Sequence, residues 1–255
     1  MKIFVMAGTE DGRQLAEFLF EHGHEVTASV VSEYGRKLLE QYDGIKVVAK
    51  KLDADELAEI LRADNFQILV DGSHPYASGA SKSALEACDR VNIPYVRFER
   101  ATGVTGAKNV YHVENYLEAA AKAAELGKNI YLTTGSRNLK TLVDALAGRE
   151  CVITARILPT AEVLAECEAL GLTPKQICAM QGPFSTELNV ELFKHAGAEV
   201  IVTKDGGQVG GADTKIAAAR ILKLPVVVID RPKVSYPNVA ATFEEVLEFV
   251  QSSRM

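Results

Sequence analysis

The chain has 255 residues, 47% of them hydrophobic, and a formal net charge of -6. This length provides a sizeable core in one large domain or two modest ones. The negative charge argues against nucleic acid or an anionic membrane surface as the main partner. No apolar stretch approaches the roughly 20 residues of a membrane span, and the N-terminal apolar run leads into an acidic glycine turn rather than a signal-peptide cleavage site. We therefore expect no membrane partner.

The cysteines indicate the compartment. Cys88, Cys151, Cys167 and Cys178 lie far apart and form no C-x-x-C pair. Such spacing is typical of buried thiols in a reducing cytoplasm rather than of a disulfide framework or a metal site. We expect a cytoplasmic protein that holds no metal of its own.

Short β-branched runs alternate with helical patterns along the chain. In the first part, strands are predicted at 2–7, 25–31, 45–49, 67–71 and 94–98, and helices at 11–22, 33–42, 53–63 and 78–91. After a loop-like joint at 101–109, strands are predicted at 110–113, 129–133, 150–155, 176–180, 199–203 and 225–229. The helices of this second part are predicted at 114–126, 137–147, 160–170, 185–196, 211–222 and 242–252.

Several of these strands, such as "EVIVTKDG" and "PVVVID", are apolar throughout, which is typical of parallel strands covered on both faces. Repeated strand–helix units of this kind give an α/β fold with right-handed crossovers. Eleven predicted strands are many for one open sheet, so we predict two doubly wound domains, 1–100 and 101–255. An eight-stranded α/β barrel is the alternative.

The first strand turns into the first helix through "AGTEDGR". Backbone N–H groups at such a turn, together with the helix dipole, favour phosphate. Gly8 and Gly12 allow close approach of a ligand or backbone, Thr9 adds a hydroxyl, and Arg13 adds a bidentate phosphate donor. The spacing is not G-x-G-x-x-G, and any strand-to-helix turn favours glycine, so a plain turn is the alternative.

Residues after the second strand bear on the choice of dinucleotide. A ribose hydroxyl is usually bound by an acid at this point, and a 2′-phosphate by a cation. Here Ser29 and Ser32 stand near the strand end, followed by Glu33, Arg36 and Lys37. The mixture leaves NADH and NADPH open, with Arg36 slightly favouring NADPH.

Cations gather at the carboxyl ends of the predicted strands, where ligands bind in open α/β sheets. Six strands end in or are followed by at least one arginine or lysine, in a protein that is acidic overall. The residues are Arg13, Arg97, Arg100, Arg137, Arg156, Lys204 and Arg231. Each alone could be a surface charge, but their shared position predicts a ligand with several negative charges.

Two further segments carry candidate chemistry. In "TKDGGQVGGADTK" (203–215), Lys204 and Lys215 flank a glycine-rich connection that could clamp carboxylates or simply be a flexible turn. In "DGSHPYA" (71–77), His74 could donate a proton or polarise a ligand, or it could only cap the next helix.

Several segments occur together in the order found in one known family. "AGTEDGR", "SVVSEYG", "DGSHPYA", "IPYVRFER", "TTGSRNL" and "VTKDGGQVGGADTKIAAA" give a chain that, from about residue 2 to 232, resembles the precorrin-6A reductases and cobalt-precorrin-6A reductases of cobalamin biosynthesis. In the usual Gly-Gly-Thr of the first turn, the first glycine is Ala7 here, which fits only if the backbone keeps an ordinary conformation.

The resemblance implies an oxidoreductase that transfers a hydride from NADPH or NADH to the conjugated macrocycle of precorrin-6A, giving precorrin-6B. It implies two Rossmann-like domains with a cleft between them, the N-terminal one holding the nicotinamide cofactor and the C-terminal one contributing to tetrapyrrole binding. The expected cofactor residues are Gly8, Thr9, Glu10, Gly12, Arg13, Ser29, Ser32 and Arg36. The expected substrate residues are His74, Tyr76, Arg97, Arg100, Arg137, Lys204 and Lys215, and the proton-donor candidates are Glu10, His74 and Asp205.

Two other functions remain open from the residues. One is an NAD(P)-dependent reductase of a small carbonyl compound, although no suitable Tyr-x-x-x-Lys pair follows a strand. The other is a nucleotide-sensing module without chemistry, which would leave the strand-end cations without a purpose. The sequence leaves open whether the macrocycle carries cobalt and how many chains assemble.

Overall fold

The computed structural model describes residues 1–31, 33–100, 109–205 and 212–253. The chain forms two compact units, Met1–Ala101 with Pro232–Met255, and Thr102–Arg231. Each unit contains one six-stranded sheet in which all strand pairs are parallel. The chain therefore has the predicted doubly wound α/β fold, and the alternative of a barrel is wrong.

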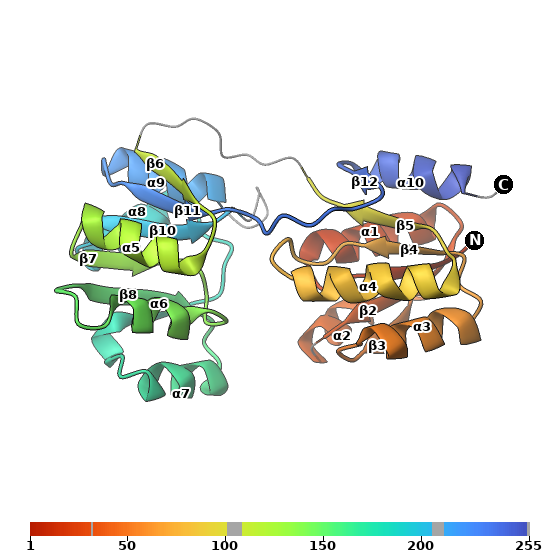
Figure 1. The fold of residues 1–255 in the computed structure, drawn as a ribbon, viewed down its shortest axis with the longest axis horizontal. Helices are drawn as coiled ribbons and strands as arrows, with labels where there is room; N and C mark the ends of the chain where they lie inside the picture. Colours follow the sequence, from red (N-terminus) through yellow and green to blue (C-terminus); the bar gives the residue numbers. More distant parts are fainter. Residues whose placement is uncertain (32, 101–108, 206–211, 254–255) are drawn as a thin grey trace. The chain divides into compact units, whose positions relative to one another are not determined.

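The first unit alternates strands and helices in the order β1 (Lys2–Met6), α1 (Glu10–Glu21), β2 (Glu25–Val30), α2 (Glu33–Leu39), β3 (Lys46–Ala49), α3 (Ala54–Ala63), β4 (Ile68–Asp71), α4 (Ser78–Val91) and β5 (Tyr95–Phe98). The returning C-terminal segment adds β12 (Val239–Ala240) and α10 (Phe243–Ser252). The sheet order is β12-β5-β4-β1-β2-β3 (Figure 1). From β1 the chain adds β2 and β3 on one side and then β4 and β5 on the other, so the topological switch point lies between β1 and β4.

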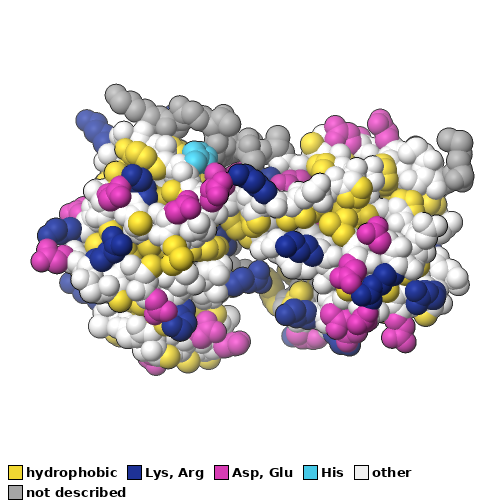
Figure 2. All heavy atoms as spheres, viewed as in Figure 1, with side chains coloured by type: hydrophobic (Ala, Val, Ile, Leu, Met, Phe, Trp, Pro, Cys, Tyr) yellow, Lys and Arg dark blue, Asp and Glu magenta, His cyan; other side chains and the backbone are white. Residues whose placement is uncertain are grey.

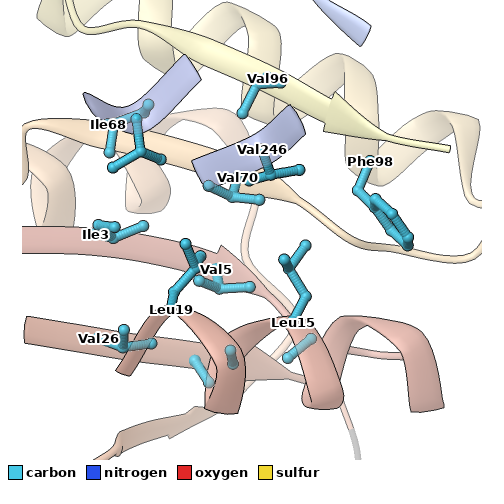
Figure 3. Packing of buried hydrophobic residues seen from close by; sticks show 14 of the residues in the cluster. Ile3, Val5, Leu15, Leu19, Val26, Ile68, Val70, Val96, Phe98 and Val246 are labelled. Carbon is cyan, nitrogen blue, oxygen red and sulfur yellow. The ribbon is translucent and has the colours of Figure 1, made fainter. Parts of the chain in front are cut away.

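Alternate residues of β1 explain why that strand is apolar throughout. Val5 packs with Leu15 and Leu19 of α1 and with Val246 of α10 on one face of the sheet, as Figure 3 shows. Phe4 points to the other face, where α3 and α4 supply residues such as Leu57 and Ala84. Both faces are therefore covered, as expected for a parallel sheet.

The second unit runs β6 (Val110–Val113), α5 (Tyr116–Leu126), β7 (Asn129–Leu132), α6 (Leu139–Leu146), β8 (Val152–Ile157), α7 (Ala161–Ala169), β9 (Ile177–Ala179), α8 (Thr186–His195), β10 (Val200–Lys204), α9 (Ala212–Ile221) and β11 (Val226–Ile229). A short 3₁₀ turn, Pro174–Gln176, precedes β9. The sheet order is β6-β11-β10-β7-β8-β9, with the switch point between β7 and β10. Phe193 of α8 and Ala219 of α9 pack with Ile201 and Val228 in the core.

The unit boundaries differ from the predicted 1–100 and 101–255 in one respect. Residues 232–255 belong with the first unit, because Val239 and Ala240 pair with Arg97 and Phe98 of β5. Val246 and Val250 of α10 then join the core of this unit. Most of the predicted joint, 101–108, lies outside the described residues.

Charges of both signs are interspersed on the face of the molecule drawn in Figure 2. Exposed ion pairs of the described residues, such as Lys122 with Glu125 and Lys128 with Glu150, contribute little to stability. Within the described residues, no helix is both long and apolar enough to cross a bilayer. The four cysteines form no disulfide; Cys88 and Cys167 are buried as predicted, whereas Cys151 and Cys178 are half-buried.

Candidate functional site

The turn from β1 to α1 lies at the switch point of the first sheet. Thr9 begins the helix as its N-cap, and its Oγ1 accepts a hydrogen bond from the Gly12 N–H at 2.9 Å. The same hydroxyl donates to the carbonyl of Gly72, just after β4, at 2.9 Å. A Cβ on Gly12 would lie 2.7 Å from that carbonyl oxygen, so only glycine fits there. Gly12 thus allows the backbone at the start of α1 to approach the backbone just after β4 closely.

Ala7 and Gly8 complete this turn. The Ala7 N–H continues the strand pattern by donating to the Ser29 carbonyl at 2.8 Å, and Ala7 is not among the residues with positive φ. Alanine is therefore compatible with the turn. A Cβ on Gly8 would meet nothing within 4 Å, so the space above Gly8 is open to a ligand.

The start of α1 can hold a phosphate. The first hydrogen bonds of the helix run from the Gly12 N–H and the Arg13 N–H to Thr9. In the described part of the chain, the N–H groups of Glu10 and Asp11, which precede them, have no acceptor, as is usual at a helix N-terminus. These donors, with the half-buried side chain of Arg13 one turn on, suit the phosphate groups of a dinucleotide.

Two acidic residues also occupy this first turn. Asp11 Oδ1 lies 2.7 Å from Arg100 Nη2. Burial raises the pKa of Asp11, and the positive charge of Arg100 opposes that rise. Glu10 is exposed and accepts a hydrogen bond of 3.4 Å from Gln14. Arg100, expected to bind substrate, is therefore held at the start of α1, where the cofactor was expected to bind.

The other expected cofactor residues are placed differently. Ser29 lies opposite Met6 at the carboxyl end of β2, beside the turn. Ser32 lies outside the described residues. Arg36 is exposed on α2 and pairs with Glu40 at 2.7 Å and Glu33 at 3.9 Å. Exposed pairs of this kind are weak, so Arg36 can still exchange its partners for a phosphate.

His74 and Tyr76 lie in the loop between β4 and α4, and both are half-buried. His74 Nδ1 accepts from the Tyr76 N–H at 3.2 Å, and the His74 carbonyl accepts from the Ala77 N–H at 2.7 Å. Accepting at Nδ1 requires that the neutral ring carries its proton on Nε2. His74 therefore shapes the turn before α4, with the ring proton on Nε2.

The structure does not support the expected role of Arg97 in binding a substrate carboxylate. Its side chain is 1% exposed and donates to Asp71 Oδ1 at 2.9 Å and to Ser73 Oγ at 3.1 Å. It also lies 3.3 Å from Glu99 and stacks on the ring of Tyr236. A guanidinium enclosed by these partners is inaccessible to a large ligand.

In the second unit, four cations gather around the switch point. Lys204 ends β10, Arg137 follows β7, Arg156 lies in β8, and Lys215 lies in α9. Because β10, β7 and β8 are neighbours, their carboxyl ends adjoin. Among the described residues, no carboxylate pairs with Arg137 or Arg156. We call these four residues the cation cluster.

The electrostatics of the cation cluster agree with this proximity. Burial lowers the pKa of Lys204, and Arg137 lowers it further. Burial, then Arg156 and then Lys204, lower the pKa of Lys215 to about 7. An anionic ligand would offset the repulsion between these positive charges.

Arg156 is one of the strand-end cations noted in the sequence, but it was not among the expected substrate residues. Its side chain is 6% exposed, donates to Asn189 Oδ1 at 2.7 Å and lies 4.2 Å from the centre of the Phe184 ring. A buried guanidinium without an anionic partner is costly, which points to a ligand that supplies the anion.

Asp205, expected as a proton donor, is 5% exposed. Its Oδ2 lies 3.5 Å from Arg231 Nε, which also donates to the Asp205 carbonyl at 3.1 Å. This burial does not support proton transfer to a bulky substrate. The glycines at 206, 207, 210 and 211, expected to form a clamp, lie outside the described residues.

Comparison with known proteins bears on the family of this chain. The family described as "Precorrin-6x reductase CbiJ/CobK" matches residues 2–251. The cobalt-precorrin-6A reductase of Priestia megaterium is 39% identical and covers 96% of each chain, and that of Methanocaldococcus jannaschii is 37% identical and covers 100% of each. The solved structure of a CobK precorrin-6A reductase superposes with a TM-score of 0.82 over 100% of this chain and 97% of the other at 24% identity, which supports the fold. With a family match and relatives of this identity along almost its whole length, the chain belongs to the precorrin-6x reductase family.

Proposed function

We propose that this chain reduces the precorrin-6A macrocycle in cobalamin biosynthesis, using NADPH or NADH as the hydride source. Membership of the precorrin-6x reductase family supports the reaction. The observation that carries the assignment of sites is that each unit presents an anion-binding arrangement at its own switch point. The first is the start of α1, and the second is the cation cluster.

The start of α1 is the proposed cofactor site. The N–H groups of Glu10 and Asp11 would bind phosphate, Arg13 would add a charged donor, and the open space over Gly8 admits the ligand. When bound, the nicotinamide supplies the hydride, while the protein supplies position and electrostatics. Thr9 fixes this turn to the end of β4.

The cation cluster is the proposed site for the carboxylate side chains of the tetrapyrrole. Arg137 is exposed, Lys204 and Lys215 are partly buried, and Arg156 lies deeper. Guanidinium groups bind carboxylates bidentately, whereas the lysines act as point charges. The cluster would orient the macrocycle through its acidic arms.

A proton must reach the ring after the hydride. Of the expected donors, Glu10 is exposed at the start of α1 and His74 has a ring N–H at Nε2, whereas the burial of Asp205 counts against it. His74 and Glu10 are therefore the proposed donors.

We further propose that the substrate is the cobalt form. The two relatives at 39% and 37% identity are both named cobalt-precorrin-6A reductase. A relative named precorrin-6A reductase, from Rhodobacter capsulatus, is 27% identical. The cobalt would arrive inside the substrate, so the chain needs no ligand set for it.

The test is a spectroscopic assay of the purified chain with each reduced nicotinamide and with precorrin-6A in its cobalt and metal-free forms. Oxidation of the nicotinamide together with a shift of the visible band of the macrocycle is expected. Tight nucleotide binding with an unchanged macrocycle spectrum would instead identify a nucleotide sensor.

Two variants separate the proposed sites. Arg13→Ala should weaken nicotinamide binding first, and Lys204→Ala should raise the KM for the macrocycle with little effect on the nicotinamide. The matched control is Lys140→Ala, because Lys140 is exposed on α6 and pairs with Asp144 one turn away. Equal losses for both ligands in the Lys204 variant would contradict the assignment of the cation cluster.

A further inference from the structure

A buried polar network lies at the carboxyl ends of β4 and β5. Asp71 is fully buried, and its Oδ1 accepts from the Ser73 N–H and from Arg97 Nη1, both at 2.9 Å. Its Oδ2 accepts from Ser81 Oγ at 2.6 Å and from the Tyr95 hydroxyl at 2.7 Å. Four donors, two from β5, one from the loop after β4 and one from α4, thus converge on one carboxylate of β4.

Both members of the central pair are charged. Burial alone would raise the pKa of Asp71, but the charge of Arg97 and the hydrogen bonds from Ser73, Ser81 and Tyr95 lower it below its ordinary value. Burial likewise opposes the charge of Arg97, and Asp71 raises the pKa of that guanidinium. Because desolvation offsets much of the attraction in a buried pair, such a pair is weak evidence for stability. Its fixed hydrogen-bond geometry suggests that it determines position instead.

The backbone that this network fixes is the one that contacts the cofactor turn. Gly72 lies between Asp71 and Ser73, and Arg97 Nη1 also reaches the Asp71 carbonyl at 3.3 Å. The Gly72 carbonyl accepts from Thr9 Oγ1 at 2.9 Å. A Cβ on Gly72 would lie 2.9 Å from the Gly12 Cα, so the two backbones are already as close as they can be. A displacement of Gly72 must therefore displace Thr9 and the start of α1.

The returning C-terminal segment closes the network. The Arg97 guanidinium lies 5.5 Å from the centre of the Tyr236 ring, and that ring stacks on Tyr95 with centroids 6.3 Å apart. The Arg97 N–H donates to the Asn238 carbonyl at 2.9 Å, and Asn238 Nδ2 donates to the Tyr95 carbonyl at 3.0 Å. This cover keeps water away from the pair and strengthens its hydrogen bonds.

We infer that Arg97 and Asp71 are positioning residues, which hold the Gly72 carbonyl so that Thr9 sets the start of α1 for the cofactor phosphate. The inference rests on the proposed cofactor role of that turn. Both residues are buried, and both act on the turn through Gly72 and Thr9. The network thus accounts for a buried cation that substrate binding does not explain.

The test compares Arg97→Lys with its matched control Arg90→Lys. A lysine keeps the charge but has a single nitrogen, so it cannot bind Asp71 and Ser73 while also binding Glu99, as Nη1 and Nε of the guanidinium do. We expect the Kd for NADPH to rise about tenfold, as for the loss of one good charged hydrogen bond. The KM for the macrocycle should change less than about twofold, which is within RT of no effect. Arg90 is exposed on α4 and pairs with Asp55 and Glu86, so its replacement should change neither value.

Thr9→Val shows whether Arg97 acts through Thr9. Valine keeps the shape of threonine and removes the hydroxyl that binds Gly72 and Gly12. If the two residues share one route, the double variant should lose hardly more NADPH affinity than either single variant. Losses that multiply would overturn the inference.

Two further measurements keep a structural effect and a failed function apart. If Arg97→Lys lowers the denaturation midpoint but the folded protein binds NADPH as tightly as before, Arg97 is only structural and the inference is wrong.

Hydrogen exchange of the Gly12 amide, which needs no ligand, should accelerate in Arg97→Lys and not in Arg90→Lys. If the wild type fails to bind either nicotinamide, the proposed function fails, while this exchange rate still decides whether Arg97 positions the turn. Tyr95→Phe, which removes one donor to Asp71 and keeps the ring, is the milder variant should Arg97→Lys not fold; it should accelerate the same exchange.

Discussion

Replacing Gly12 by alanine tests the close backbone approach at the turn from β1 to α1, the proposed cofactor site. The added Cβ would lie 2.7 Å from the Gly72 oxygen, 3.0 Å from the Ala7 Cα and 3.1 Å from the Met6 oxygen. All three are backbone atoms, so α1 itself must move. Overpacking costs about 1–3 kcal/mol, and rigid neighbours put this site near 3. Alanine regains at most about 1 kcal/mol of helix propensity, which leaves a loss of about 2 kcal/mol.

Urea unfolding followed by circular dichroism measures this loss. With a slope of about 2 kcal/mol per molar urea, the midpoint should fall by about 1 M. Hydrogen exchange in β1 and β4 assigns the change to the first unit. The NADPH affinity of the folded variant should also fall, because α1 is displaced.

The matched control is Gly8→Ala, four residues earlier in the same turn. Its Cβ meets nothing within 4 Å, and Gly8 is not among the glycines with positive φ. The unfolding free energy should therefore stay within about 0.5 kcal/mol of the wild type. A Gly12→Ala protein as stable as the wild type, or a Gly8→Ala protein equally destabilised, would refute the reasoning.

Two further predictions concern pH. Burial and the neighbouring cations lower the folded-state pKa of Lys215 to about 7, so the unfolded chain binds more protons above that pH. The free energy of unfolding of the second unit should rise between about pH 7 and 10 by up to about 1.4 kcal/mol per pH unit. In urea titrations, Lys215→Met should abolish that slope. Equal slopes in the wild type and the variant would contradict the lowered pKa of Lys215. Asp71 gives a slope of the same sign in the acid range. Despite burial, Arg97 and its other donors lower the pKa of this carboxyl, so its contribution is present above about pH 3.9, the unfolded-state pKa, and is lost as pH falls through the lower folded value. Asp71→Asn should cost about 3–5 kcal/mol at neutral pH by removing the nearer of the two carboxylates beside the buried Arg97. Acid titration of this variant should lose the transition that the wild type shows.

The order of residues is enough to specify the α/β class and nearly every helix and strand. Apolar runs such as those of β10 and β11 are long enough to be recognised without a partner, because a strand buried on both faces needs no polar residues. The switch-point rule likewise selects the turn at Thr9 and the strand-end position of Lys204 from the alternation of strands and helices.

Which strand ends meet, and which way each side chain points, depends on how the chain folds back on itself. β12 has two residues, and nothing in Val239–Ala240 indicates that it pairs with β5, so the place of the C-terminal segment could not be read from the sequence. Arg97 follows the same strand-end rule as Lys204, yet Asp71 lies directly opposite it in the sheet register and takes up its charge. Strand-end position is a local property of the sequence. Whether a cation there faces a ligand or a buried carboxylate depends on the neighbouring strand, and long-range pairing alone brings that strand into place.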